Sequence, residues 1–456
     1  MRELLNIAAA RACQYLEDLG ERRVAPAAEA IERLKSLDVP LPAEPTDPLK
    51  VLALLDDIGS PASVASAGRR YFGFVTGGTL PAALAANWLA GAWDQCAGLV
   101  TLSPVAAYLE EIALQWLRDI FGLPAETGGG FVTGATMANF TCLAAARHAV
   151  LAQAGWDVES QGLFGAPPIT VVVGEHVHVS LLKALWLLGL GRERVIRVPA
   201  NDQGRMRAEL LPRISGPTIV CIQAGEVNTG GFDPAAEICA IGHRHGAWVH
   251  VDGAFGLWAA AAPARAHLTA GVSEADSWAT DAHKWLNVPY DSGIALVRDV
   301  RHLNAAMSTD AAYLVHLEKR EPNLHVPEMS RRARGVEIWA ALASLGRSGL
   351  ANLIERTCRY AARFAEGLSA AGYSLLNDVV LNQVLVSFGD DEATRRVIAG
   401  IQADGTCWCG GTVWRGRAAM RISVSSWATT EEDVERSLAA MLRVAATHAP
   451  KSTSPR

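Results

Sequence analysis

Two residues in the middle of the chain, Asp252 and Lys284, have the types and the spacing for chemistry on an imine-forming cofactor. Asp252 directly follows the apolar run AWVHV (247–251), and Lys284 lies 32 residues later between His283 and Trp285. A carboxylate at the carboxyl end of a buried strand lies at the usual ligand crevice of an open α/β sheet. A lysine among apolar residues can form a Schiff base. Pyridoxal phosphate requires such an aspartate for its pyridinium nitrogen and such a lysine for its imine. An ordinary strand-end aspartate and a surface lysine would produce the same pattern.

Three further segments could complete such a site. The segment GGGFVTGATMANF (128–140) combines a glycine-rich loop, a short strand and a helix start, so the amides of Ala135 and Thr136 could face an anion. His178 follows the run ITVVV and could stack on a planar ring, although a structural histidine is the simpler interpretation. The turn GEVNTGGFDP (225–234) could equally be only a loop. The chain has neither the lysine of a P-loop nor the spacing GxGxxG, which argues against a nucleotide site.

The elements that must position these residues are predicted by short apolar runs that alternate with helical segments between residues 128 and 300. Their continuous hydrophobicity predicts strands that are buried on both faces, as in a mostly parallel sheet of an α/β domain. The runs are FVT (131–133), ITVVV (169–173), RVIRV (194–198), TIVCI (218–222), AWVHV (247–251), SWAT (277–280) and GIALV (293–297).

The segments on either side of this region are predicted to be mainly helical. Residues 1–70 have a helical pattern with a proline-rich linker at 37–49, residues 82–122 predict two helices, and residues 335–370 predict one long helix. After residue 371 the pattern is α+β, with the runs YSLLN, NQVLVSF and MRISVS and helices at 391–404 and 430–446. We expect an N-terminal helical segment (1–90), a large cofactor-binding domain (91–335) and a small C-terminal domain (336–456).

Composition excludes several classes of protein. The 456 residues include 41 Lys and Arg against 47 Asp and Glu, so the net charge of −6 argues against a nucleic-acid binder. Half of the residues are hydrophobic, which a long disordered protein would not show. The apolar stretches are interrupted by charged residues before they reach the length of a membrane span. The first residues predict an amphipathic helix and not a signal peptide. We therefore expect a cytoplasmic protein without nucleic-acid or membrane partners.

The cysteines and tryptophans add two observations. Most of the eight cysteines lie singly in apolar runs, and the pair Cys407 and Cys409 has no second pair at zinc spacing, so we expect no metal site. Without a signal peptide, a reducing compartment is favoured. The 13 tryptophans outnumber the 10 phenylalanines and the 7 tyrosines, which raises the question whether tryptophans line a pocket.

Taken together, these motifs resemble the group II pyridoxal-phosphate-dependent amino-acid decarboxylases: aromatic-L-amino-acid, glutamate and diaminobutyrate decarboxylases and their bacterial relatives. The resemblance covers residues 60–446, and DAHKW at its distance after HVDGA is its most specific part. It implies the α/β fold of fold-type I, the aspartate aminotransferase-like fold, and a homodimer with active sites at the subunit boundary. The matching stretches are YFGFVTGG (71–78), SPVAAYLEE (103–111), TGATMANF (133–140), the His178 segment, HVDGAFG (250–256), DAHKW (281–285), AAYL (311–314) and MRISVS (420–425).

The resemblance also implies a role for each residue around the cofactor, pyridoxal 5′-phosphate. Lys284 forms the aldimine, and Asp252 keeps the pyridine nitrogen protonated. His178 stacks on one face of the ring and Ala254 lies against the other face.

The resemblance also implies which residues contact the phosphate group of the cofactor. Ala135, Thr136 and His283 hold the phosphate, and Asp281 stands next to it where several relatives have asparagine.

The substrate carboxylate is expected at Arg421, as in glutamate decarboxylases. Phe72, Phe74 and Thr76 match the strip that shapes the substrate pocket, and Gln95 matches a substrate-contacting glutamine in part of the family.

One departure concerns the proton that follows the loss of CO₂. Family decarboxylases carry a mobile loop with a tyrosine that is thought to protonate the quinonoid carbon, but the stretch 314–332 is shorter and has no tyrosine. His316 and His325 are the nearest alternative acids, and each could equally be an ordinary loop histidine. Loss of that tyrosine is associated in this family with aldehyde formation.

The leading hypothesis is therefore a carboxy-lyase that converts an L-amino acid to its amine and CO₂, with aromatic amino acids as one candidate class. An aldehyde synthase, an oxidative deaminase or an aminotransferase would keep the cofactor and change the reaction. A non-catalytic homologue that binds the cofactor and a nucleotide-binding α/β protein are the alternatives from other classes.

Overall fold

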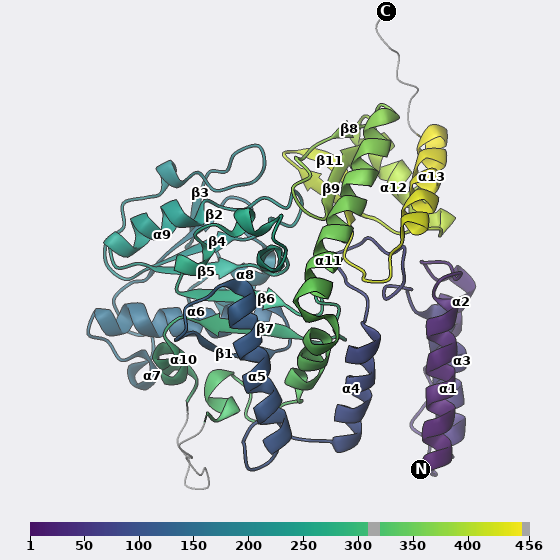
Figure 1. The fold of residues 1–456 in the computed structure, drawn as a ribbon, viewed down its shortest axis with the longest axis horizontal. Helices are drawn as coiled ribbons and strands as arrows, with labels where there is room; N and C mark the ends of the chain where they lie inside the picture. Colours follow the sequence, from purple (N-terminus) through teal and green to yellow (C-terminus); the bar gives the residue numbers. More distant parts are fainter. Residues whose placement is uncertain (309–319, 449–456) are drawn as a thin grey trace, which may run out of the picture. The chain divides into compact units, whose positions relative to one another are not determined.

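The computed structural model describes residues 1–308 and 320–448, which divide into two compact units (Figure 1). The large unit comprises residues 79–359 and 377–383. The small unit comprises residues 1–78, 360–376 and 384–456, of which the last eight lie outside the description. Residues 1–78 belong to the same unit as the C-terminal part of the chain, and the division into residues 1–90, 91–335 and 336–456 stays a prediction.

The large unit is built on a seven-stranded sheet in the order β1-β7-β6-β5-β4-β2-β3. Strands β2 to β6 run parallel to one another, and β7 is antiparallel to both β6 and β1. Each of the seven apolar runs forms one strand, so the prediction of a mostly parallel seven-stranded sheet is confirmed. The bounds are β1 Gly128–Val132, β2 Thr170–Gly174, β3 Ile196–Val198, β4 Thr218–Gln223, β5 Trp248–Asp252, β6 Ser277–Asp281 and β7 Gly293–Val297.

Helices cover both faces of this sheet. Side chains alternate between the faces of a strand, and His250 on β5 contacts Asn139 of helix α6 whereas Val249 meets Gly242 of helix α9. Helices α6 and α9 therefore lie on opposite faces, and α8 and α10 pack on the side of α6. The helices of this unit are α4 Pro81–Trp93, α5 Pro104–Phe121, α6 Ala135–Gln153, α7 Val158–Gln161, α8 Val179–Leu187, α9 Ala235–Arg244 and α10 Val300–Met307.

The predicted long helix after residue 335 is interrupted. Helix α11 spans Arg334–Ala370 and leads from the large unit into the small one, but Gly346 inside it has φ +60°. That conformation is accessible to glycine at little cost, so the glycine divides α11 into two helical parts. Within residues 1–308 and 320–448, the helices lack the length or the apolar character needed to cross a membrane.

The small unit joins the two ends of the chain. The backbone of Val24 bonds to Gly405, and the buried Arg70 side chain donates to the carbonyl of Thr406 and pairs with Asp433. Strand β10 was not predicted, because its glycines and alternating exposure give no continuous apolar run. The elements are α1 Arg2–Asp18, α2 Ala28–Arg33, α3 Pro48–Ala62, β8 Ser374–Leu375, β9 Gln383–Ser387, α12 Asp391–Asp404, β10 Gly410–Trp414, β11 Arg417–Ser423 and α13 Glu431–His448.

Candidate active site

Three segments of the large unit meet at the carboxyl end of β6. Asp281 is the last residue of that strand, and Lys284 follows three residues later. The Lys284 Nζ atom lies 2.9 Å from Oδ2 of Asp281. The other carboxylate oxygen of Asp281 accepts the amide hydrogen of Ala135, the first residue of α6, at 2.6 Å. Asp281 therefore ties the lysine turn to the start of helix α6.

Asp252 occupies the same edge of the sheet on the neighbouring strand β5. Its side chain is buried, its Oδ2 accepts from Nδ2 of Asn139 at 3.1 Å, and its Oδ1 accepts from the amide of Ala254 at 3.2 Å. Burial raises the pKa of Asp252, and the charges of His178 and Lys284 together with the Asn139 hydrogen bond oppose that rise. The three residues predicted to be catalytic thus interact electrostatically at one place.

His178 is positioned by the start of helix α8. It caps that helix, because its Nδ1 accepts from the amide of Ser180 at 3.2 Å and lies 2.7 Å from the Ser180 hydroxyl oxygen. An N-cap side chain is held in this way by an otherwise unpaired amide of the first turn. The half-buried imidazole is thereby fixed at the carboxyl side of β2, the edge where Asp252 ends β5.

The turn before α6 is a close approach between two backbones. A Cβ atom added to Gly293, the first residue of β7, would overlap the backbone of Gly134. Ala135 and Thr136 follow at the helix start, where backbone amides favour an anion. The Ala135 amide already donates to Asp281, so an anion bound at this helix end would lie near the Asp281 carboxylate.

His283 completes the surroundings of this turn. Its Nδ1 accepts from the amide of Ser292 at 3.1 Å, so its proton resides on Nε2, which lies 3.5 Å from Oδ1 of Asp281. Burial lowers the pKa of His283. Its ring stacks on Tyr290 with centroids 4.2 Å apart, and the Tyr290 side chain is largely exposed.

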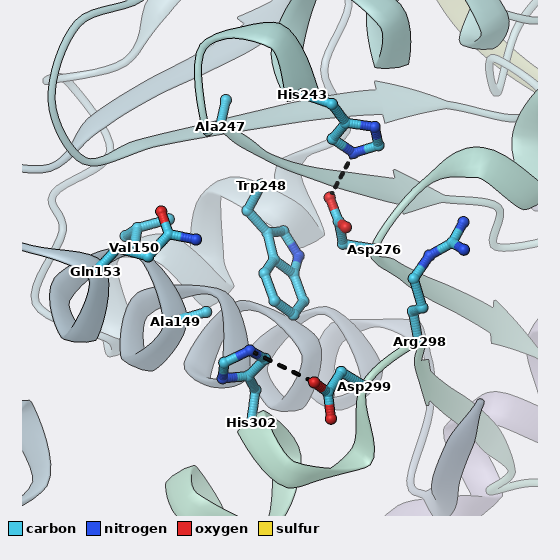
Figure 2. A pocket seen from close by; sticks show the side chains of 11 residues that line it. Ala149, Val150, Gln153, His243, Ala247, Trp248, Asp276, Arg298, Asp299 and His302 are labelled. Carbon is cyan, nitrogen blue, oxygen red and sulfur yellow. Dashed lines mark hydrogen bonds and ion pairs between the residues drawn. The ribbon is translucent and has the colours of Figure 1, made fainter. Parts of the chain in front are cut away.

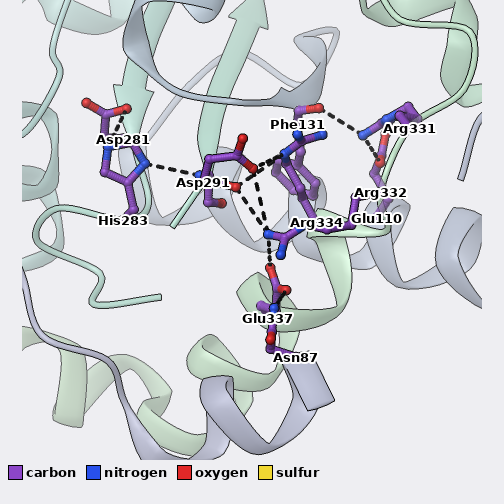
Figure 3. Close-up of polar contacts among 11 residues, drawn as sticks. Asn87, Glu110, Phe131, Asp281, His283, Asp291, Arg331, Arg332, Arg334 and Glu337 are labelled. Atoms are coloured by element: carbon purple, nitrogen blue, oxygen red, sulfur yellow. Dashed lines mark hydrogen bonds and ion pairs between the residues drawn. The ribbon is translucent and has the colours of Figure 1, made fainter. Parts of the chain in front are cut away.

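A cluster of ion pairs supports the segment that follows Lys284 (Figure 3). Asp291 accepts from Arg334 at 3.0 Å, and Arg332 pairs with Glu337 at 3.2 Å. Nearby, Arg331 pairs with the buried Glu110 at 2.7 Å and donates to the carbonyl of Phe131 on β1. The start of α11 is therefore bound to the segment that carries the lysine and to the sheet.

Of the residues predicted to contact substrate, only Gln95 lies in the large unit. Its Nε2 donates to the carbonyl of Trp93 at 2.9 Å, and it lines a cavity of about 450 Å³ together with Cys96, Arg332 and Glu337.

The other four lie in the small unit, which is described by itself. Arg421 lies on β11, paired in register with Gly410, and the Thr76 side chain is buried. Phe72 is 1% exposed and packs edge-to-face on Phe364, so it belongs to the core of that unit. Phe74 is 63% exposed. Substrate contacts of these residues stay predictions.

The two histidines considered as proton donors have different outcomes. His316 lies outside the described residues. His325 is buried, its Nδ1 lies 3.0 Å from the carbonyl oxygen of Glu321, and burial lowers its pKa to about 3. The low pKa favours the neutral form of this imidazole, and a role of His325 as the proton donor stays a prediction.

Three buried polar residues behind Asp252 were not predicted from the sequence to belong to the site: Asn139, His250 and Ser277. They connect Asp252 to the interior of the sheet through hydrogen bonds. One signal was available for His250, because a residue two positions before Asp252 on a strand points to the same face. Asn139 and Ser277 could not be found this way, because they come from a helix and from another strand.

Comparison with known proteins adds independent findings. Residues 33–388 match the model of the pyridoxal-dependent decarboxylase conserved domain. The chain is 31% identical over 381 residues to L-2,4-diaminobutyrate decarboxylase of Rhizobium meliloti (strain 1021), a match covering 79% of this chain and 74% of that protein. It is 28% identical over 408 residues to tryptophan decarboxylase 1 of Oryza sativa subsp. japonica, covering 81% of this chain and 78% of that protein.

The fold is similar to a crystal structure of Oryza sativa TDC with PLP and tryptamine. The TM-score is 0.90 at 22% sequence identity, and the match covers 98% of both chains. At this identity the likeness concerns the fold alone. It confirms the predicted fold-type I architecture.

Proposed function

Since the chain belongs to the family of pyridoxal-dependent decarboxylases, we propose that Lys284, Asp252 and His178 form the site at which it decarboxylates an L-amino acid. The chain is a carboxy-lyase whose cofactor is pyridoxal 5′-phosphate and whose products are an amine and CO₂. The observation that carries the assignment is the arrangement at the carboxyl edge of the sheet, where Asp252 ends β5 and Lys284 contacts Asp281 at the end of the neighbouring strand β6 at 2.9 Å.

The groups present suit this cofactor. When bound, pyridoxal 5′-phosphate supplies an aldehyde that condenses with primary amines and a protonated pyridine ring that withdraws electrons. Lys284 provides a primary amine with limited exposure, 2.9 Å from Asp281. Asp252 accepts one hydrogen bond at each oxygen from Asn139 and Ala254, and a carboxylate has about four acceptor positions, so it can also accept an N–H from the ring.

Each residue then has a defined task. Lys284 would hold the cofactor through its amine, which lies beside Asp281. Asp252 would keep a proton on the ring nitrogen by offering a negative acceptor. His178, held by Ser180, would cover one ring face and exclude water from it, and Ala254 would lie against the other. These roles are supported by the positions of the side chains at the sheet edge.

The phosphate is assigned to the start of helix α6. Thr136 offers an amide and a hydroxyl in the first helical turn, and His283 offers the proton on Nε2. Ala135 is the third candidate, and Asp281 lies beside it as the partner of Lys284. The positive end of the helix dipole favours an anion at this position.

The proposed substrate class is aromatic L-amino acids. Support comes from the exposed Phe74, which stacks on Trp408 at 5.5 Å, and Trp408 in turn stacks on Tyr71 at 5.1 Å. Tyr71 and Phe74 belong to the N-terminal stretch (71–78) that the resemblance assigns to the substrate pocket, and Trp408 packs on both of them. Arg421 is the proposed partner of the substrate carboxylate, with Thr76 and Gln95 as further contacts.

Decarboxylation is favoured over aldehyde synthesis, oxidative deamination and transamination, because the relatives by sequence are decarboxylases.

The proposed assembly is a homodimer. Support comes from Trp88, Leu89 and Trp93 on helix α4, which are 44%, 56% and 42% exposed and would be covered by a partner subunit. The proposed location is the cytoplasm, which suits eight cysteines that are all free.

A panel experiment tests the function. The purified protein with pyridoxal 5′-phosphate is incubated with the proteinogenic amino acids and with 2,4-diaminobutyrate, and CO₂, amine, aldehyde and peroxide are measured together. We expect equal amounts of CO₂ and amine from an aromatic amino acid. Lys284→Ala should abolish both products and the absorbance of the bound cofactor, whereas Lys183→Ala on the exposed side of α8 should change neither. Peroxide with aldehyde, or no product from any amino acid, would contradict the proposal.

A further inference from the structure

A continuous row of hydrogen bonds runs through the sheet and ends on Asp252. Nε1 of Trp248 lies 2.9 Å from Oγ of Ser277, and the same oxygen lies 2.8 Å from Nδ1 of His250. Nε2 of His250 lies 2.8 Å from Oδ1 of Asn139, whose Nδ2 lies 3.1 Å from Oδ2 of Asp252. All five side chains are buried.

The chemistry of the two ends determines the direction of every bond between them. The indole nitrogen of Trp248 can only donate, so the oxygen of Ser277 accepts there and its hydroxyl hydrogen points to Nδ1 of His250. An ionised carboxylate can only accept, so Asn139 presents its NH₂ group to Asp252 and its oxygen to His250. His250 must therefore carry its proton on Nε2. Burial lowers the pKa of His250 to about 3, in agreement with this neutral form.

The fold explains why these residues meet. Residues 248, 250 and 252 alternate along β5 and so point to one face of the sheet, the face that α6 covers with Asn139. Ser277 stands directly opposite His250 in the register of the parallel strands β5 and β6. Sequence positions far apart are thereby placed in one row with all donors directed toward Asp252.

We infer that Asn139 and His250 are positioning residues that hold the Asp252 carboxylate ionised and oriented toward the ring nitrogen of the cofactor. The inference rests on the proposed role of Asp252. Donors aligned in a row polarise one another, which strengthens the final bond to the carboxylate. Without that bond, only the Ala254 amide and the charges of His178 and Lys284 would offset the cost of burying the Asp252 carboxylate.

The groups that face Asp252 come from several elements. His178 precedes α8, Lys284 and Asp281 lie at the end of β6, and Asn139 lies on α6. The charge of Asp252 also acts on two buried thiols, Cys142 on α6 and Cys221 on β4. Burial raises the pKa of both thiols, and Asp252 raises it further by a smaller amount. Of these, Asn139 is the one whose side chain donates a hydrogen bond to the carboxylate as a neutral group, so its removal changes the bond without changing the formal charge.

The row begins at a pocket on the opposite edge of the sheet (Figure 2). This pocket has a volume of about 320 Å³, and the Trp248 ring lies in it edge-to-face with His302 at 5.7 Å. Its polar side chains pair with one another, His243 with Asp276 at 2.9 Å and His302 with Asp299 at 3.9 Å. Arg298, which also lines the pocket, donates to the carbonyls of Ala275 and Ser273, so we assign no ligand to this pocket.

The test compares cofactor binding by five variants. Apoprotein is titrated with pyridoxal 5′-phosphate, and the absorbance of the bound cofactor is followed from pH 6 to 9 alongside kcat and KM. Asn139→Leu should weaken cofactor affinity about tenfold or more, as expected for a hydrogen bond to a charged group. His250→Phe should weaken cofactor affinity a few-fold by the same principle. The affinity of His250→Gln should lie between those of His250→Phe and the wild type, because its amide can still donate to Asn139. The loss should fall on kcat more than on KM.

Trp278→Phe is the matched control. Trp278 is a buried tryptophan on β6 whose Nε1 donates to the carbonyl of Val272 and not into the row. It should lower thermal stability while cofactor affinity and the pH profile of absorbance stay unchanged. If the Asn139 and His250 variants behave like Trp278→Phe, the row is merely structural and the inference is overturned.

Asp252→Ala separates this inference from the proposed function. If Asp252→Ala loses cofactor affinity and activity but the row variants do not, only the positioning inference fails. If Asp252→Ala binds the cofactor and reacts like the wild type, the proposed role of Asp252 fails, and the inference falls with it. Should Asn139→Leu not fold, the two His250 variants decide the question by themselves.

Discussion

The amine nitrogen of Lys284 lies 2.9 Å from a carboxylate oxygen of Asp281, three residues earlier in the chain. The second oxygen of Asp281 accepts the amide hydrogen of Ala135 at 2.6 Å. One side chain thus holds both the lysine that is proposed to bind the cofactor aldehyde and the helix start that is proposed to bind its phosphate. The carboxylate is 2% exposed, so both contacts are made away from water.

We expect the two contacts of Asp281 to be separable by substitution. Asp281→Asn keeps an oxygen for the Ala135 amide, whereas Asp281→Ala leaves that amide and the Lys284 amine without this partner. The alanine variant should therefore be less stable than the asparagine variant by about 1–3 kcal/mol, the cost of an unpaired buried donor. Urea unfolding of the apoproteins measures the difference, with the exposed Asp38→Ala as control. Equal stabilities of the two Asp281 variants would contradict this account.

Glu110 should be among the most sensitive positions for stability. Burial alone would raise the pKa of Glu110, but the charges of Arg331 and Arg320 bring it below its usual range. Glu110→Gln leaves both arginines uncompensated and should cost about 3–5 kcal/mol of unfolding free energy.

The pH dependence of the Glu110 contribution has a definite sign. Because the folded pKa is lowered, the stabilisation is present above the ordinary glutamate pKa and is lost as the pH falls through the folded value. Denaturant unfolding at pH 7 and at pH 4 should show a smaller difference between wild type and Glu110→Gln at the lower pH. Asp119→Asn, which breaks an exposed 4.0 Å pair with Arg347, should change stability by less than about 0.5 kcal/mol.

His250 should make the protein sensitive to acid. Its folded pKa of about 3 lies below the ordinary histidine value, so below about pH 6.5 only the unfolded chain takes up the proton. Stability should therefore fall with decreasing pH, by up to about 1.4 kcal/mol per pH unit from this group. His250→Gln should be less stable at pH 7 but lose stability less steeply between pH 6.5 and 4. The exposed His267→Gln should keep the wild-type slope, and an unchanged slope in His250→Gln would contradict the prediction.

Gly293 should tolerate no side chain. A Cβ atom there would overlap the backbone of Gly134, so Gly293→Ala must displace the turn that precedes Ala135. We expect a loss of about 1–3 kcal/mol from overpacking and weaker cofactor binding, measured by unfolding and by cofactor titration. Gly59→Ala is the control, because the nearest atom to its Cβ is 4.0 Å away and alanine favours the helix interior. Wild-type cofactor affinity in Gly293→Ala would contradict the prediction.

Much of the fold could be predicted because local patterns determine it. The seven apolar runs became the seven strands, and helix α12 begins and ends at the predicted residues, since Asp390 accepts the amide of Ala393 as its cap and Gly405 ends it in a left-handed conformation. Strand β10 escaped prediction because β11 holds it in place, and its own glycines give no signal. The break in α11 at Gly346 was also missed, because a glycine inside a helical pattern can keep either conformation. The burial of His325 was missed because it depends on the packing of distant segments.

The sequence by itself determined the chemistry: an aspartate at a strand end, a lysine after the next strand, a histidine before a helix, and the decarboxylase family to which these motifs belong. The tertiary structure alone decided how those groups are held. Asp281 contacts both Lys284 and Ala135, and Asn139, His250 and Ser277 form one row behind Asp252. Strand register and helix packing place partners 27 to 146 positions apart within hydrogen-bond distance in these contacts. The spacing of residues along the chain does not predict such contacts, since they depend on which strands become neighbours.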